Sequence, residues 1–131
     1  MSDNKKPSFD SWLEEEKDGT NAGKIGMYLC HNGVVRESAK AKVREGCNDT
    51  PAVRGMRFSY DAAKVREVQK EALTLPGIYT VRIWLNDGEL AVGDDLMCVL
   101  IGGDIRPNVT AALDTVVGRL KNECVREEEL Y

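Results

Sequence analysis

Two arginines stand at positions where a phosphate or carboxylate ligand could be bound. Arg36 follows the apolar pair Val34-Val35, so a strand end can hold its stem while its guanidinium reaches a site. Arg106 follows Gly102-Gly103, which allows close backbone approach to a ligand, and precedes a helix whose first amides attract anions. A guanidinium binds such anions through paired hydrogen bonds. We predict both arginines as substrate-binding residues, against the alternative of solvated surface arginines.

Composition narrows the classes of function. The chain has 131 residues, a net charge of −4 and a pI of about 5.1, which disfavours broad nucleic-acid binding but allows a local basic pocket. Its longest apolar run, 96–101, is too short to cross a bilayer, and its first residues form no secretory signal. We therefore expect a cytoplasmic protein that binds no nucleic acid and no membrane.

No metal or cofactor is expected. The four cysteines, at 30, 47, 98 and 124, are widely spaced and match no CxxC zinc or redox pattern, so free thiols are predicted. His31 is the sole histidine, and one histidine builds no ordinary zinc site. From sequence alone it receives no catalytic role.

The elements that must hold these residues follow from apolar periodicity and turn residues. We expect a disordered tail at 1–7 and a single domain at 8–131. Within it we predict helices at 8–18, 61–75 and 107–122, strands at 24–30, 53–60, 78–85 and 96–101, a short extended piece at 90–93 and an acidic tail at 123–131. At Asn32-Gly33 the chain either turns or continues as one bulged strand. Glu37–Thr50 is a long polar loop, either functional or simply solvated. This order predicts an α+β two-layer sandwich, with helices packed on a mostly antiparallel or mixed sheet.

Several short motifs occur together in a specific order. They are Gly33-Val34-Val35-Arg36, the strand–helix unit from Val53 to Leu75, the turn Gly88-Glu89-Leu90-Ala91-Val92-Gly93-Asp94, and Arg106 before a helix that ends in Leu120-Lys121. In this order they resemble the large, catalytic subunit family of molybdopterin synthase, over roughly 24–126.

The resemblance implies an α/β-hammerhead-like fold and a homodimer. It also implies a partner, a small ubiquitin-like sulfur-carrier subunit whose C-terminal thiocarboxylate enters a pocket. There sulfur would pass to a pterin phosphate substrate, cyclic pyranopterin monophosphate, in molybdenum cofactor biosynthesis. The family carries no metal for this step.

The sequence departs from the family pattern at two places. Ile105 stands where the family usually has a histidine, and Arg126 stands nearest the position of its catalytic lysine. An arginine stays protonated and is a poor proton shuttle, although it can neutralise a developing oxyanion. Lys121 could supply the amine, or it could only complement the helix dipole. Arg126 and Lys121 are therefore the predicted catalytic residues. The competing hypothesis is a non-catalytic paralogue that binds a pterin, another phosphate ligand or a carrier protein.

Overall fold

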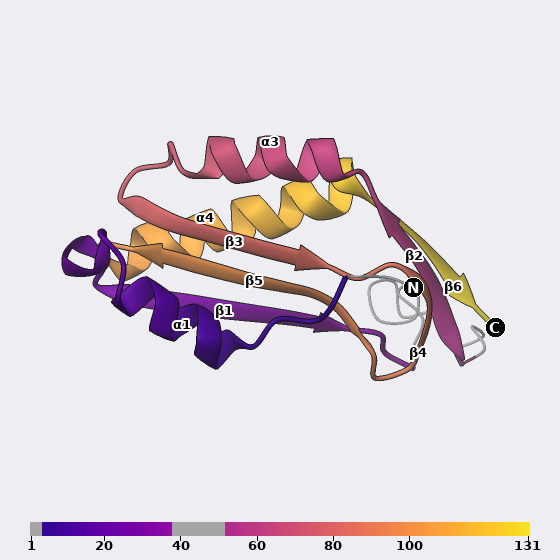
Figure 1. Cartoon of the computed structure of the whole chain (residues 1–131). Helices are drawn as coiled ribbons and strands as arrows, with labels where there is room; N and C mark the ends of the chain where they lie inside the picture. Colours follow the sequence, from indigo (N-terminus) through magenta and orange to yellow (C-terminus); the bar gives the residue numbers. More distant parts are fainter. Residues whose placement is uncertain (1–3, 38–51) are drawn as a thin grey trace.

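Two three-stranded antiparallel sheets and three α-helices make up the chain in the computed structural model, which describes residues 4–37 and 52–131 (Figure 1). The elements are α1 (Phe9–Lys17), η1 (Ala22–Lys24), β1 (Met27–Val34), β2 (Gly55–Tyr60), α3 (Ala62–Ala72), β3 (Ile78–Leu85), β4 (Gly88–Ala91), β5 (Asp95–Gly103), α4 (Arg106–Arg119), η2 (Leu120–Cys124) and β6 (Val125–Leu130). The predicted α+β class is confirmed.

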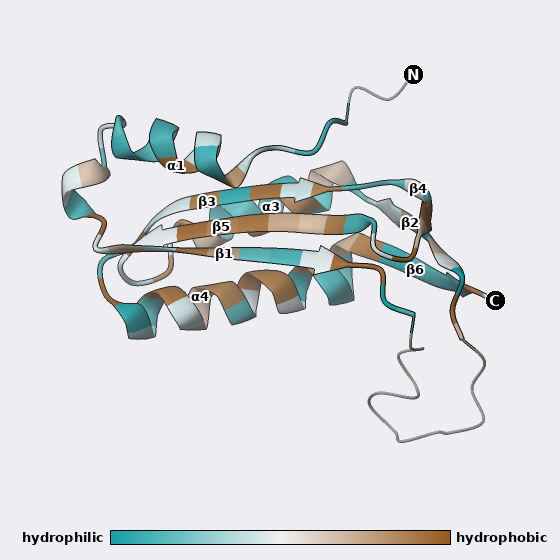
Figure 2. Cartoon of the chain, turned by 90° about the horizontal axis from the view of Figure 1, so that it is seen from below, coloured by the Kyte–Doolittle hydropathy of each residue, from teal (hydrophilic) through white to brown (hydrophobic). Residues whose placement is uncertain are grey.

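The larger sheet has the strand order β1-β5-β3 and forms the centre of the molecule. Helices α3 and α4 cover one face and α1 lies over the other (Figure 1). The middle strand, β5, is hydrophobic along most of its length (Figure 2), and Met97 to Ile101 are almost fully buried. The strand predicted at 96–101 is confirmed, and both of its faces are covered, as is usual for a strand that is apolar throughout.

The smaller sheet has the order β4-β2-β6, and its third strand was missed by the sequence analysis. The acidic tail predicted at 123–131 forms the end of η2 and the strand β6, which pairs with β2 from Gly55↔Leu130 to Tyr60↔Val125. Glutamate has a low propensity for strands, so the local sequence does not predict this strand. Its charges are matched across the sheet instead, since Arg57 contacts Glu89 at 2.7 Å and Glu128 at 3.1 Å.

Local sequence signals set most of the other boundaries. Ser8 caps α1 by accepting a hydrogen bond from the Ser11 amide, and Asp61 caps α3 through the amides of Ala63 and Lys64. At Asn32-Gly33 the bulged-strand alternative is correct, because β1 runs on to Val34 with a register shift between Gly33 and Val34.

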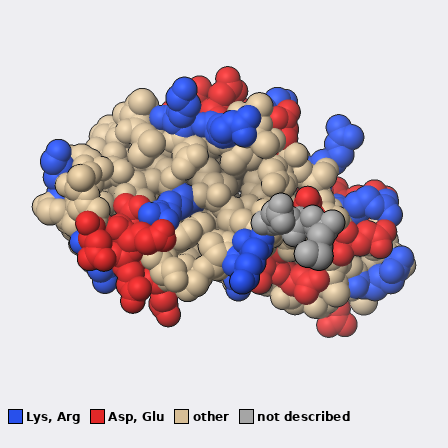
Figure 3. Space-filling model, viewed as in Figure 1, with Lys and Arg blue, Asp and Glu red and all other residues tan. Residues whose placement is uncertain are grey.

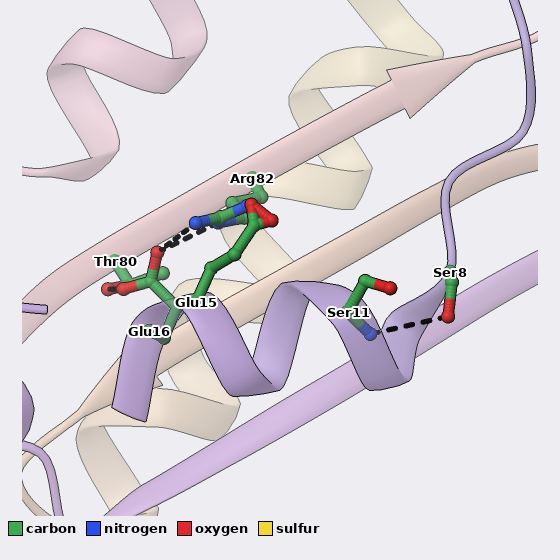
Figure 4. Close-up of polar contacts among 6 residues, drawn as sticks. All are labelled: Ser8, Ser11, Glu15, Glu16, Thr80 and Arg82. Atoms are coloured by element: carbon green, nitrogen blue, oxygen red, sulfur yellow. Dashed lines mark hydrogen bonds and ion pairs between the residues drawn. The ribbon is translucent and has the colours of Figure 1, made fainter. Parts of the chain in front are cut away.

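The N-terminal helix is fastened to β3 by a cluster of polar contacts (Figure 4). The Arg82 guanidinium donates to Glu16 at 2.8 Å and to Glu15 at 3.3 Å, and the Thr80 hydroxyl donates to the other Glu16 oxygen. The Arg82 guanidinium also lies 5.9 Å from the centre of the Trp12 ring. Figure 3 shows acidic side chains gathered over α1, which helps explain why a basic residue on β3 holds this helix.

The segment before α1 contacts the same sheet. Asn4 donates to the Leu85 carbonyl oxygen at 2.6 Å, and Lys6 lies 3.0 Å from Asp95. Met1–Asp3 and most of the predicted Glu37–Thr50 loop, with its basic residues, lie outside the described residues. Among the described residues, no helix is long and apolar enough to cross a membrane.

Candidate functional site

A pocket of about 600 Å³ lies where the end of the larger sheet meets the smaller one. β1, β5, η2, β2 and β6 all contribute to its wall. Its lining residues are His31, Gly33, Val34, Arg36, Met56, Leu96, Met97, Lys121, Val125, Glu127 and Glu129. The volume is in the range of pockets that hold small-molecule ligands. Two of the four predicted site residues, Arg36 and Lys121, meet here.

Arg36 is placed by the turn between β4 and β5. The residue before it, Val35, is 2% exposed and forms two backbone hydrogen bonds with this turn, donating to Asp94 and accepting from Gly93. The Asp94 carboxylate accepts from the Ala91 amide at 2.8 Å, and Gly93 has a φ of 92°. Only glycine adopts this φ readily, so the turn residues act structurally, as the sequence predicts, and they fix the strand end that carries Arg36.

Lys121 is placed by the change from α4 to the wider turn η2. Leu120, just before it, is fully buried in the core, whereas the Lys121 side chain is exposed and lines the pocket. The wide turn ends at Val125, whose amide donates to the Leu120 carbonyl oxygen. Arg119 supports it from α4 by an ion pair with Glu123 at 2.9 Å. Lys121 therefore projects from a short, well-anchored segment.

The alternation of β6 separates its side chains into two sets. Val125, Glu127 and Glu129 line the pocket, while Arg126, opposite Ser59 on β2, is exposed and is not among the lining residues. The pocket wall on this side therefore carries two carboxylates, and the predicted catalytic residue Arg126 is not grouped with Arg36 and Lys121.

Arg106 lies at the opposite end of the larger sheet from Arg36. β1 and β5 are antiparallel, with Val34 opposite Asp95 and Met27 opposite Gly103, so Arg36 adjoins the start of β5 while Arg106 follows its end. Nine residues of strand separate these ends by roughly 30 Å. Arg106 is exposed at the first position of α4, and it does not line the pocket.

His31 is the pocket residue to which the sequence analysis gave no role. It lies two residues before Gly33 on β1, so both face the same side of the strand. Burial lowers the pKa of its imidazole below the usual 6.5, and the nearby Lys121 lowers it further. Two-residue periodicity with Gly33 was the available local signal, but the approach of Lys121 depends on the tertiary fold.

The described residues contain no group of three or more His, Cys, Asp or Glu side chains placed to hold a metal ion. Cys30 is exposed, and Cys98 and Cys124 are buried; all three are free thiols, and Cys47 lies outside the described residues. Burial, the larger influence in each case, raises the pKa of both buried thiols, which keeps them in the unreactive protonated form.

The model of the MoaE protein family matches residues 5–123. The chain belongs to the MoaE family. This confirms the resemblance drawn from the ordered motifs. No curated protein matches the chain.

Solved structures of MoaE-type proteins share the fold. Molybdopterin synthase from Staphylococcus aureus superposes with a TM-score of 0.69 at 15% identity, covering 95% of this chain and 85% of that one. The molybdopterin cofactor biosynthesis protein E of Burkholderia multivorans gives 0.71 at 21% identity, with 96% and 82% covered. A chain from the complex of subunits 1 and 2 of the molybdopterin-converting factor of Helicobacter pylori gives 0.64 at 14% identity, with 95% and 84% covered.

Proposed function

We propose that this MoaE-family chain is the large subunit of a molybdopterin synthase, acting in molybdenum cofactor biosynthesis in the cytoplasm. It would transfer sulfur from a thiocarboxylated carrier protein to cyclic pyranopterin monophosphate. The observation that carries the proposal is one pocket lined by both Arg36 and Lys121, which lie far apart in the sequence.

The charges of the pocket suit the two ends of such a substrate. Arg36 offers a guanidinium to a phosphate, and such charge-assisted hydrogen bonds are about twice as strong as neutral ones. Glu127 and Glu129 offer acceptor oxygens only, which match the N–H groups of a pterin ring. A guanidinium for the phosphate and two carboxylates for the ring therefore support an oriented substrate.

The structure supports a role in the pocket for some of the four predicted site residues more than for others. In this proposal Arg36 binds the phosphate and Lys121 supplies the amine next to the reacting atoms. Their shared pocket favours this assignment over a helix-dipole role for Lys121. Arg106 and Arg126 stay predictions, because neither lines the pocket that holds the other two.

A carrier subunit and a second copy of the chain complete the proposal. The Helicobacter pylori structure is a complex of two converting-factor subunits, which supports a small-subunit partner for a chain of the same fold. The homodimer rests on the resemblance to the synthase family. Sedimentation of the purified chain at micromolar concentration tests it, and a monomer alone would contradict it.

The decisive experiment is a reconstituted assay with the purified chain, thiocarboxylated carrier and cyclic pyranopterin monophosphate. We expect molybdopterin to form. Arg36→Ala should reduce the rate at least tenfold, because one charge-assisted hydrogen bond contributes about 1.5–3 kcal/mol. Arg66→Ala is the matched control, since Arg66 is exposed on α3 away from the pocket, and it should keep the wild-type rate.

The same assay distinguishes the synthase from the alternative, a non-catalytic binding protein. A non-catalytic paralogue would bind pterin phosphate or carrier, lose that binding with Arg36→Ala, and form no product. Absence of product from the wild-type chain with carrier bound would therefore overturn sulfur transfer and leave the binding protein. Equal rates for Arg36→Ala and Arg66→Ala would remove Arg36 from the site.

A further inference from the structure

His31 is the one histidine that lines the pocket. It lies in the middle of β1 and is half-buried, and within the described residues it has no hydrogen-bond partner. A Cβ built on Gly33 would lie 3.8 Å from the His31 Nε2 atom and 3.2 Å from Met97 Cγ, so this nitrogen lies beside Gly33 and Met97, two other residues that line the pocket. The half-buried Nε2 atom of His31 can therefore bind a ligand or a water molecule in the pocket.

The charged groups around His31 come from three elements. Arg36 follows β1, Lys121 comes from η2, and Glu127 and Glu129 come from β6. Burial first and Lys121 second lower the pKa of the imidazole, so at neutral pH the ring is uncharged and Nε2 can accept a proton. An arginine stays protonated, and a carboxylate is a weaker base than an imidazole.

We propose that His31 is the proton acceptor of this pocket during sulfur transfer, a role that rests on the proposed function. The step begins with a thioester between the carrier's acyl carbon and a sulfur already bonded to the pterin. Water attacks the acyl carbon; its C–O bond forms and the C–S bond breaks. The sulfur stays on the pterin as a thiolate and the carrier leaves as a carboxylate. Of the two protons released, one passes to His31 Nε2 and the other to solvent, and nothing is oxidised or reduced.

The position of Lys121 fits the same step. The ammonium of Lys121 adds to the larger effect of burial in lowering the pKa of His31, and it can stabilise the oxyanion that develops on the acyl oxygen. Ile105, exposed at the far end of the larger sheet, has no group that could exchange a proton. Proton transfer within this chain is therefore assigned to β1 rather than to the start of α4.

The test is the pH dependence of the reconstituted reaction, with wild type compared to His31→Gln. Glutamine keeps the size and polarity of the side chain and cannot accept the proton. The wild-type rate should rise with pH to a plateau, with its midpoint below 6.5. His31→Gln should be about 100-fold slower, a typical general-base contribution, and should lose this pH dependence. Added imidazole should partly restore the rate of His31→Gly.

A spectroscopic readout accompanies the rates. Because the chain has one histidine, its imidazole NMR signals are unique and their titration gives the His31 pKa directly. This pKa should equal the kinetic midpoint, and Lys121→Met should raise it. A product-forming wild type with an unchanged rate and pH profile in His31→Gln overturns the His31 assignment alone. A wild type that forms no product overturns the proposed function and this role with it. An imidazole pKa unmoved by Lys121→Met contradicts the described pocket.

Discussion

Replacing Glu16 by alanine is expected to loosen α1 from the larger sheet. The carboxylate accepts hydrogen bonds from the Thr80 hydroxyl and the Arg82 guanidinium, and its side chain is only 18% exposed. Hydrogen bonds to charged groups contribute about 1.5–3 kcal/mol each when they are protected from solvent. Arg82 is 27% exposed, so we take the lower end, and expect the free energy of unfolding to fall by about 2–3 kcal/mol.

For a chain of this length, 1 kcal/mol corresponds to about 4 °C in Tm, so Glu16→Ala should lower Tm by about 10 °C. Glu14→Ala is the matched control on the same helix, since Glu14 is exposed and its side chain forms no hydrogen bond or ion pair among the described residues. A double-mutant cycle with Arg82→Met, read by urea unfolding, should give a coupling energy of about 1–2 kcal/mol. A coupling below about 0.3 kcal/mol, or equal Tm values for the two glutamate variants, would refute this account of how α1 is held.

Three further predictions concern the pocket and its support. Because the pKa of His31 is lowered in the folded state, the unfolded chain binds a proton at this imidazole more readily, and the free energy of unfolding should rise as pH increases toward 6.5. Urea titrations between pH 5.5 and 7.5 should show this rise for the wild type and not for His31→Gln. Leu120→Ala should cost about 2–5 kcal/mol because Leu120 is fully buried, whereas Leu73→Ala, at a residue 44% exposed, should change the free energy of unfolding by under about 1 kcal/mol. Gly33→Ala would place a methyl group 3.2 Å from Met97 Cγ and 3.8 Å from His31 Nε2; Tm should change by only a few degrees while turnover falls, and unchanged turnover would show that the space above Gly33 is not used.

Much of the fold could be predicted where a single element carries its own signal. Asp61 is a residue type that favours the start of a helix, and it caps α3. The strand predicted at 78–85 agrees with β3 at both ends. The continuous apolar run at 96–101 correctly predicts the strand β5. These signals are local, because caps and periodicity depend on residues within one or two turns.

Less of the candidate site could be predicted from the sequence. The motif with Arg36 predicts a site residue that lines the pocket, whereas the acidic composition of 123–131 predicts only a tail, because the stability of β6 comes from pairing with β2. Without that strand its alternation could not be used, so Arg126 was grouped with Lys121 although only Lys121 lines the pocket. His31 gained a candidate role only when η2, about 90 residues further along the chain, brought Lys121 beside it.

The wide turn η2 joins α4 to β6 without an intervening loop, and this makes the pocket sensitive to insertions and deletions. A strand shifted by one position exchanges its two faces. Loss of one residue between Leu120 and Val125 would therefore bring Arg126, Glu128 and Leu130 to the positions on the wall now held by Val125, Glu127 and Glu129. The wall would change from two carboxylates to one carboxylate and one guanidinium. In evolutionary terms, loss of a single codon in this turn could change which ligands the pocket binds, although the sequence of β6 itself would stay the same.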